Sequence, residues 1–214
     1  MSWKQEFIHF SIKRKALIFG EFKLKSGRFS PYFFNSGSFY TGHDICKLGY
    51  FYARVMVESK IKLSTLYGLA YKGIPIVTAT IFSLYKYYNI NLSFCFNRKK
   101  TKEYGEGGNL IGYNYEKNII MIDDVITAGV AIRDSIKSIK KNTTKLNIST
   151  IVVALDRQEL GCNNISAVQE LEKENNCKII SIINIQDLIQ YLSDKKDMKT
   201  NLEKLHKYRI NYGI

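Results

Sequence analysis

The chain has 214 residues, 45% of them hydrophobic, and a formal net charge of +13 at pH 7. This length fits one α/β domain with a small appendage, and the hydrophobic fraction is sufficient for a substantial core. A basic charge of this size suggests nucleic-acid binding, but no recognised nucleic-acid-binding module accompanies it. Most of the basic residues are lysines scattered among residues with A/T-rich codons, so we expect no nucleic-acid partner.

The cysteines and the N-terminus indicate the compartment. Four cysteines stand far apart, without a C-x-x-C pair or nearby histidine pairs: Cys46, Cys95, Cys162 and Cys177. Such a pattern is typical of thiols in a reducing compartment. Lys4 and Glu6 lie within the first turns of the chain, which predicts neither a signal peptide nor a membrane span. We expect a cytoplasmic protein with no membrane partner.

The first two elements are expected to be a helix and a hairpin. Apolar residues at helical spacing predict a helix over residues 2–18 with Ser2 as its cap. Residues 21–39 then alternate between apolar and polar, with a Ser-Gly turn at 26–27 and Pro31 restricting the segment to a sheet edge. We expect this second segment to form a small N-terminal hood, over about residues 19–40.

A strand-to-helix turn is expected next. Residues 43–59 are predicted to be helical, and residues 65–70 form a strand that leads into Tyr71 and Lys72. Pro75 suits the first turn of the following helix, which continues through residues 76–88. The free N–H groups of that turn, with Lys72 beside them, could hold a phosphate. The alternative is an ordinary solvated lysine before a helix.

A glycine-rich basic segment follows the short strand at residues 92–96. It begins with four cations, Arg98, Lys99, Lys100 and Lys102, and continues with three glycines between positions 105 and 108. Glycines favour a flexible backbone, and cations on a moving loop can neutralise a departing anion. We expect a flexible basic lid loop over about residues 98–110; the alternative is a disordered basic loop with no function.

The central stretch runs from residue 118 to residue 131. The buried strand at residues 119–122 ends in Asp123 and Asp124, and a small-residue turn at 127–129 leads into a helix from Val130. The helix start can bind a phosphate through its backbone, which Gly129 allows to come close. The two acids would repel a phosphate and must face hydroxyls or a metal ion, so a sugar phosphate is indicated. The alternative is an ordinary turn with Asp124 or Thr127 as a helix cap.

The last third of the chain continues the alternation of strands and helices. A strand at residues 148–155 ends in Asp156 and Arg157, and the guanidinium of Arg157 suits a ligand carboxylate. A salt bridge with Asp156 is the structural alternative. A helix at 164–175, a strand at 178–184 and one or two closing helices at 186–208 complete an α/β fold with a mostly parallel sheet.

Five stretches carry a family resemblance. IDDVITAGVA (122–131) resembles the phosphoribosyl-diphosphate signature of type I phosphoribosyltransferases. Four others resemble the bacterial orotate phosphoribosyltransferase family in order and spacing: FKLKSGRFSPYFFNSG (22–37), LAYKGIP (69–75), CFNRKKTKEYGEGGNLIG (95–112) and ALDRQELG (154–161). The resemblance implies the type I phosphoribosyltransferase fold in a single domain, 1–214. It also implies transfer of ribose 5-phosphate from phosphoribosyl diphosphate to orotate, giving orotidine 5′-monophosphate and pyrophosphate in UMP biosynthesis.

The resemblance also implies the residues of the site. The catalytic residues would be Lys99, Lys102, Asp123 and Asp124. Phosphoribosyl diphosphate would contact Lys25, Tyr71, Lys72, Arg98, Lys99, Lys102, Tyr104, Asp123, Asp124, Val125, Ile126, Thr127, Ala128, Gly129, Val130 and Ala131. Orotate would contact Phe33, Phe34, Thr127 and Arg157. The cofactor would be Mg²⁺ held mainly through the substrate and water, with no direct side-chain ligand. The lid would act on the neighbouring subunit of a homodimer.

Two positions depart from the family pattern. Tyr104 stands where a histidine is usual, and Val130 stands where the phosphate loop commonly ends in threonine or serine, so we expect weaker contacts at both. Two other functions stay open. A different base could accept the ribose, or the chain could be a regulatory protein of the same fold that binds phosphoribosyl diphosphate.

Overall fold

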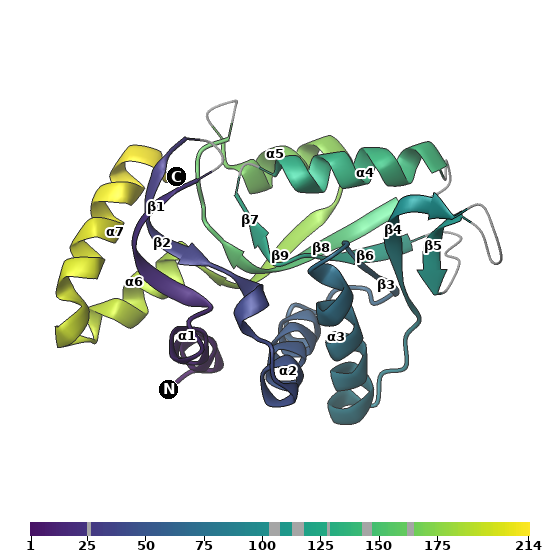
Figure 1. The fold of residues 1–214 in the computed structure, drawn as a ribbon, viewed down its shortest axis with the longest axis horizontal. Helices are drawn as coiled ribbons and strands as arrows, with labels where there is room; N and C mark the ends of the chain where they lie inside the picture. Colours follow the sequence, from purple (N-terminus) through teal and green to yellow (C-terminus); the bar gives the residue numbers. More distant parts are fainter. Residues whose placement is uncertain (25–26, 103–107, 113–117, 128, 143–146, 162–164) are drawn as a thin grey trace.

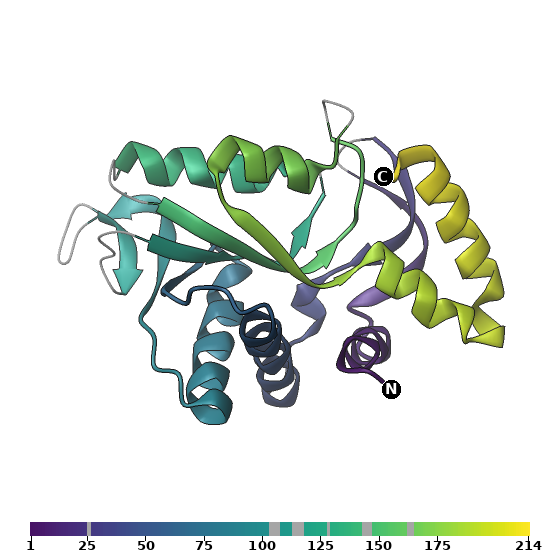
Figure 2. The ribbon, with the colours of Figure 1, turned by 180° about the vertical axis from the view of Figure 1, so that it is seen from behind.

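The computed structural model describes residues 1–24, 27–102, 108–112, 118–127, 129–142, 147–161 and 165–214. A central sheet divides the molecule, with α4 (Val130–Asn142) and α5 (Ala167–Asn175) on one face. On the other face lie α1 (Trp3–Lys13), α2 (Gly42–Glu58) and α3 (Gly73–Tyr88), as Figure 1 and the reverse view in Figure 2 both show. This layered arrangement confirms the predicted α/β class.

The sheet has seven strands in the order β5-β4-β3-β6-β8-β7, with β9 on the other side of β8. Their bounds are β3 (Thr65–Gly68), β4 (Phe94–Lys102), β5 (Gly108–Gly112), β6 (Asn118–Ile122), β7 (Val125–Ile126), β8 (Asn147–Asp156) and β9 (Lys178–Asn184). Among these described strands only β5 runs antiparallel to its neighbour. The mostly parallel sheet is therefore confirmed, and the carboxyl ends of its central strands meet at one edge.

The central strand β6 is buried on both faces. Ile119 and Met121 pack in a core cluster with α4, whereas Ile120 and Ile122 belong to the cluster on the side of α2 and α3. Successive side chains of a strand point to opposite faces, and a parallel sheet covered by helices needs apolar residues on both. This is why the run at 119–122 is continuously apolar and does not alternate.

The N-terminal segment begins as predicted but its helix is shorter. Ser2 caps α1 with a capping box, as expected,. The helix ends at Lys13 rather than residue 18, because Lys15 adopts φ +56 and the chain turns there into a strand. That strand, β1 (Leu17–Lys23), pairs antiparallel with β2 (Phe29–Phe34), so the predicted hood is a two-stranded hairpin. A short 3-10 turn, η1 (Ser36–Ser38), follows it.

The C-terminal segment closes over the hood. One or two closing helices were predicted over residues 186–208, and the structure has two, α6 (Ile185–Ser193) and α7 (Lys199–Tyr212), separated by a 3-10 turn, η2 (Lys196–Met198). In both ribbon views α7 runs along the hood strands and the C-terminus lies beside them. The N-terminal hairpin and the C-terminal helix therefore form one end of the molecule. In the part of the chain that the structure describes, no helix has the length and apolar character needed to cross a bilayer.

The basic segment differs from the expected loop. β4 continues through Lys102, and Lys102 pairs with Gly108 at the start of β5, so residues 98–102 and 108–110 are strand residues. Backbone pairing across the hairpin overrides the preference of glycine for irregular structure. Residues 103–107, which include Tyr104, lie outside the described residues.

Candidate active site

The first strand-to-helix turn lies against the end of β6. Gly68 pairs with Ile122 in the parallel register of β3 and β6. A Cβ on Gly73 would lie 2.8 Å from the carbonyl oxygen of Ile122 and 2.9 Å from the carbonyl carbon of Gly68, so only glycine fits there,. The side-chain oxygen of Asn97 in β4 accepts a hydrogen bond from the backbone N–H of Ala70 at 2.9 Å, which fixes the turn from the other side.

The two acids lie in a gap between β6 and β7. Ile122 pairs with Val152 and Val125 pairs with Leu155, so both strands lie beside β8 in the same register. The two acids between them also bond to β8 through their backbones. The N–H of Asp123 donates to the carbonyl of Val152 at 3.1 Å, and the carbonyl of Asp124 accepts from the N–H of Ala154 at 2.9 Å. From α2, the hydroxyl of Tyr52 donates to the carbonyl of Asp123 at 2.7 Å. The backbone of the acidic pair is therefore held from two sides.

Asp123 is the more buried acid. Its side chain is 9% exposed, and its Oδ1 accepts a hydrogen bond from the N–H of Asp124 at 2.9 Å. Burial, followed by the neighbouring charge of Asp124, raises the pKa of the Asp123 carboxyl from 3.8 to about 7,. A carboxyl with this pKa changes its charge near neutral pH, which is a property common at functional sites.

Asp124 joins three segments of the chain. Its Oδ2 lies 2.8 Å from the Nζ of Lys72, the residue just before α3, and 2.9 Å from the Oγ of Ser36 in η1. The structure therefore brings the predicted phosphate lysine and the predicted acidic pair together. In the part of the chain that the structure describes, the side chain of Asp124 therefore joins separate segments rather than capping a helix.

The second strand-to-helix turn begins α4. Gly129 adopts φ +74, and a Cβ there would lie 2.7 Å from Cδ1 of Leu171. The carbonyl of Gly129 accepts the N–H of Arg133 at 2.9 Å, so the helical bonding starts at this residue. Thr127 and Val130 are exposed beside the turn. The start of α4 therefore depends on a glycine and has exposed residues on both sides of it, a geometry compatible with the predicted phosphate contact.

The adjacent hood aromatics lie on opposite faces of β2. Phe34 is 4% exposed and packs in the core against Phe7 and Phe39, whereas Phe33 is 39% exposed and contacts Phe22 with 5.6 Å between ring centroids. Neighbouring strand residues point in opposite directions. The structure does not place the two rings on one ligand-facing surface, as the sequence analysis expected, and Phe33 is the ring of the pair that is open to a ligand.

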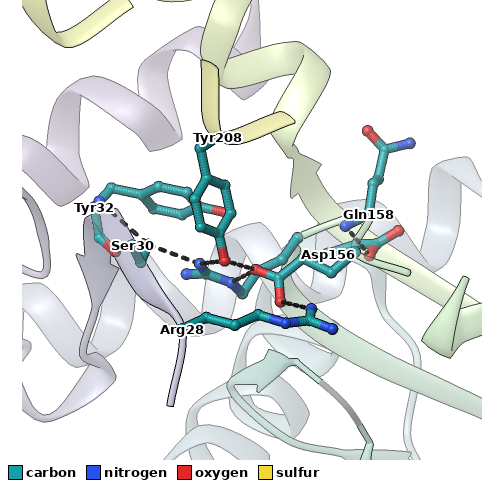
Figure 3. Close-up of polar contacts among 8 residues, drawn as sticks. Arg28, Ser30, Tyr32, Asp156, Gln158 and Tyr208 are labelled. Atoms are coloured by element: carbon teal, nitrogen blue, oxygen red, sulfur yellow. Dashed lines mark hydrogen bonds and ion pairs between the residues drawn. The ribbon is translucent and has the colours of Figure 1, made fainter. Parts of the chain in front are cut away.

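Arg157 is buried in a polar network at the end of β8. It is 3% exposed, and its guanidinium donates to Glu159 at 2.5 Å, Ser30 at 2.8 Å and the hydroxyl of Tyr208 at 3.2 Å (Figure 3). The salt bridge predicted as the alternative is therefore made with Glu159 and not with Asp156, whose Oδ1 accepts the N–H of Gln158 at 2.8 Å.

Arg157 also lies next to the phosphate loop. In the parallel pairing of β7 and β8, Ile126 is opposite Asp156. Thr127 and Arg157 therefore leave the sheet from neighbouring positions at the same edge. The structure brings together the loop residue and the arginine that were both predicted to contact orotate.

The remaining predicted residues are only partly placed. Tyr71 is 64% exposed beside Lys72, Arg98 is half-buried in β4, Val125 is half-buried and Ile126 is 2% exposed. For Lys99, Lys102 and Ala131 the structure describes the backbone alone, within β4 and α4. Lys25, Tyr104 and Ala128 lie outside the described residues.

Several contributors to the site escaped the sequence analysis. Ser36 and Asn97 each hydrogen-bond to a site turn from a distant segment, and Tyr52 supports the acidic pair from α2. Ser36 stands at the end of the first quoted motif, FKLKSGRFSPYFFNSG, so its position after the hood was a usable signal. Asn97 and Tyr52 carry no local pattern that distinguishes them from other strand and helix residues.

The similar proteins found by sequence and by structure carry the same family name. No family model matches the chain. The orotate phosphoribosyltransferase of Buchnera aphidicola subsp. Acyrthosiphon pisum (strain Tuc7) is 53% identical over 215 residues, covering 100% of both chains. That of Shigella flexneri is 48% identical over 213 residues, covering 100% of this chain and 99% of the relative.

A solved structure is similar over the same extent. The crystal structure of the Francisella tularensis orotate phosphoribosyltransferase superposes with a TM-score of 0.84 at 37% identity. The match covers 98% of this chain and 100% of the other. Sequence and fold therefore agree along nearly the whole chain.

Proposed function

The chain belongs to the orotate phosphoribosyltransferase family, and we propose that the residues at the carboxyl edge of its sheet divide that family's reaction among them. The enzyme is a pentosyltransferase of pyrimidine biosynthesis. It transfers ribose 5-phosphate from phosphoribosyl diphosphate to orotate, which gives orotidine 5′-monophosphate and pyrophosphate. The observation that carries the assignment of roles is the 2.8 Å contact between Lys72 and Asp124, which joins the two strand-to-helix turns in one site.

The two turns would hold the two phosphate ends of the substrate. The start of α4, opened by Gly129, offers unpaired N–H groups and the positive end of a helix dipole to the 5-phosphate. At the start of α3 the N–H groups of Gly73 and Ile74 already donate to the carbonyls of Leu69 and Tyr71, and Pro75 has no N–H. This turn would therefore offer the diphosphate mainly the Lys72 cation and the positive end of the helix dipole, with Tyr71 beside them. Residues 125–131 would line the first of these ends. Such positioning fixes the anomeric carbon between the base and the leaving group.

Asp123 and Asp124 would accept hydrogen bonds from the ribose hydroxyls. Loss of pyrophosphate leaves positive character on the ribose ring, and two fixed carboxylates beside the ring stabilise that charge. Asp124 is already oriented by Ser36, and the backbone of Asp123 is held by β8 and Tyr52. The acids therefore need little reorganisation when the substrate binds.

The acidic pair also fits a site for Mg²⁺. Two adjacent carboxylates next to both turns can accept hydrogen bonds from the water around Mg²⁺, but they are too few for a cage made by protein alone. Mg²⁺ would be held mainly by oxygens of phosphoribosyl diphosphate and by water, without a direct side-chain ligand, and when bound it would neutralise charge on the leaving pyrophosphate. The protein's part is to orient the ribose through Asp123 and Asp124.

Orotate would bind between the hood and the end of β8. Phe33 presents the exposed ring of the hood, and a planar base gains stacking contact with such a face,. Thr127 and Arg157 leave neighbouring strands at the same edge, and a guanidinium suits the carboxylate that distinguishes orotate from other pyrimidines,. The buried ring of Phe34 would not touch orotate; it would hold the adjacent residue Phe33 in place by anchoring β2 in the core.

The basic segment and the assembly are further parts of the proposal. Lys25 from the hood, with Arg98, Lys99 and Lys102 from β4, would neutralise the diphosphate, and Tyr104 would add a weak contact. The family resemblance supports action of the basic segment in the neighbouring subunit's site, and so a homodimer. A cytoplasmic location is supported by the free thiols of Cys46, Cys95 and Cys177,.

An absorbance assay tests the proposal. Purified protein with phosphoribosyl diphosphate and Mg²⁺ is expected to consume orotate, and to leave uracil and hypoxanthine unchanged in parallel reactions. Consumption of another base would reject the specificity. Binding of phosphoribosyl diphosphate by calorimetry, without consumption of any base, would indicate a regulatory protein of the same fold.

A further inference from the structure

The end of β8 is built as a tight turn that the C-terminus closes. Gln158 adopts φ +48, which is uncommon for a residue with a side chain, and Asp156 stabilises the turn by accepting its N–H at 2.8 Å,. The carbonyl of Gln158 accepts the N–H of Ile214 at 3.1 Å, and the N–H of Leu160 donates to the carbonyl of Tyr212 at 2.9 Å. The segment that carries Arg157 is therefore bonded by its backbone to the end of the chain.

The same region fixes the guanidinium of Arg157. Its Cζ lies 4.2 Å from the ring centroid of Tyr32, so the planar group lies on the hood aromatic,. The hydroxyl of Tyr208 accepts from Nη2 of Arg157 at 3.2 Å and donates to Oε1 of Glu159 at 2.7 Å. Figure 3 shows Tyr208 reaching the network from α7 while Ser30 and Tyr32 come from the hood. One hydroxyl thus connects both members of the buried ion pair.

The network leaves part of the guanidinium available. An arginine has five N–H donors, of which Nε uses one on Glu159 and Nη2 uses two on Ser30 and Tyr208,. Among the described residues, the two N–H groups of Nη1 have no such acceptor. Glu159 is shared between Arg157 and Arg28, at 2.5 and 3.3 Å, so it does not serve Arg157 alone. A ligand carboxylate would match the two remaining donors of the guanidinium.

We infer that Tyr208 is a positioning residue for orotate recognition: its hydroxyl holds Glu159 and Arg157 in a fixed plane, so that Nη1 is presented to the orotate carboxylate. This inference rests on the proposed role of Arg157. A fixed guanidinium pays less conformational entropy on binding than a mobile one, which is how a group that never touches the ligand raises affinity. The C-terminal helix thereby contributes to substrate selection at the sheet edge.

Tyr208→Phe tests the inference, since it removes the hydroxyl and keeps the ring. We expect the KM for orotate to rise about five- to tenfold, as for loss of one ordinary hydrogen bond, with kcat and the KM for phosphoribosyl diphosphate within about twofold of the wild type. Inhibition by uracil, which lacks the carboxylate, should not change. Equal weakening of orotate and uracil would overturn the inference, because a general structural defect affects both.

The matched control is Tyr191→Phe. Tyr191 is also a buried tyrosine near the chain's end, at 6% exposed, and its hydroxyl lies 3.3 Å from Nδ1 of His9, outside the network. The Tyr191→Phe variant should leave the KM for orotate unchanged.

Arg157→Lys separates the inference from the role on which it depends. If Arg157→Lys leaves the KM for orotate unchanged, the proposed role of Arg157 fails, and the inference fails with it. If Arg157→Lys raises that KM and Tyr208→Phe does not, only the positioning role of Tyr208 is rejected. Should Arg157→Lys not fold, the comparison of orotate with uracil in the Tyr208→Phe enzyme decides alone. In the double variant we expect no further rise in KM beyond that of Arg157→Lys.

Discussion

Lys72 and Asp124 form an ion pair of 2.8 Å between residues that are far apart in the chain, one at the start of α3 and one in the gap between β6 and β7. The lysine side chain is 50% exposed and the carboxylate 13%, so the pair contributes little to folding stability,. Its importance is positional. A cation that is weakly held beside the starts of two helices is available to a ligand phosphate, as the proposed function requires.

Lys72→Met is therefore expected to weaken substrate binding without unfolding the protein. We expect the KM for phosphoribosyl diphosphate to rise about tenfold and the free energy of unfolding to change by less than about 1 kcal/mol. Steady-state kinetics and urea denaturation measure the two effects. Lys86→Met, on the same helix but at its far end, is the control and should change neither. A large loss of stability in Lys72→Met would mean that the ion pair is structural.

Neutralising the acidic pair should remove catalysis and keep the fold. In the double variant Asp123→Asn with Asp124→Asn, each amide keeps an oxygen that can accept the bond now made by its carboxylate. The negative charge beside the ribose is lost, and we expect turnover to fall by more than about a thousandfold. Activity and circular dichroism are the measurements. Turnover close to that of the wild type would reject the assignment of these acids to the site.

Asp123 should also make stability depend on pH. Burial raises the pKa of its carboxyl to about 7 in the folded chain, against 3.8 when unfolded. Between these values the folded chain retains a proton that the unfolded chain has released, so the free energy of unfolding falls as pH rises through this window and is constant above it. The effect is at most about 4 kcal/mol.

Asp123→Asn isolates this contribution from other titrating groups. The variant should match the wild type near pH 4 and be more stable than it near pH 8, because the amide stays neutral throughout. Urea denaturation at several pH values gives both curves. A constant difference between the two proteins from pH 4 to pH 8 would contradict the raised pKa.

The sequence predicted those parts of the fold whose causes are local. The apolar run at 119–122 specifies a central strand, and the small-residue turn after it specifies a helix start, and both were found. Ile132, Ile136 and Ile139, at helical spacing, form the buried face of that helix. The end of α1 was predicted too late in the chain. The apolar residues keep helical spacing beyond Lys15, but the backbone of Lys15 adopts a positive φ and ends the helix. The basic segment was expected to be a loop, since pairing between β4 and β5 leaves no mark in composition.

The site was predictable to the same extent. The two turns could be recognised from their glycines, acids and Lys72, because the chemistry lies in consecutive residues. The contacts that connect the turns could not. Ser36 reaches Asp124 across 88 positions and Tyr208 reaches Glu159 across 49, and such pairings depend on how whole elements pack. Phe34 illustrates the same limit, because only the hood's packing shows which of two adjacent rings enters the core.

Gly73 gives the most direct test of how the first turn is built. Gly73 and Gly42 are each the first residue of a helix, α3 and α2 respectively. A Cβ at Gly73 would meet backbone atoms at 2.8 and 2.9 Å, whereas a Cβ at Gly42 would meet nothing within 4 Å. Gly73→Ala is therefore expected to displace the start of α3 from β6, and Gly42→Ala should be tolerated.

The expected result is a difference between the two alanine variants. Gly73→Ala should lower the free energy of unfolding by about 1–3 kcal/mol, as overpacking does, and should weaken binding of phosphoribosyl diphosphate more than tenfold. Gly42→Ala should stay within about 0.5 kcal/mol of the wild type in stability and keep its affinity. Urea denaturation and calorimetry measure the two quantities. If both variants bind the substrate equally well, the close approach of α3 to β6 is not what shapes the diphosphate end of the site.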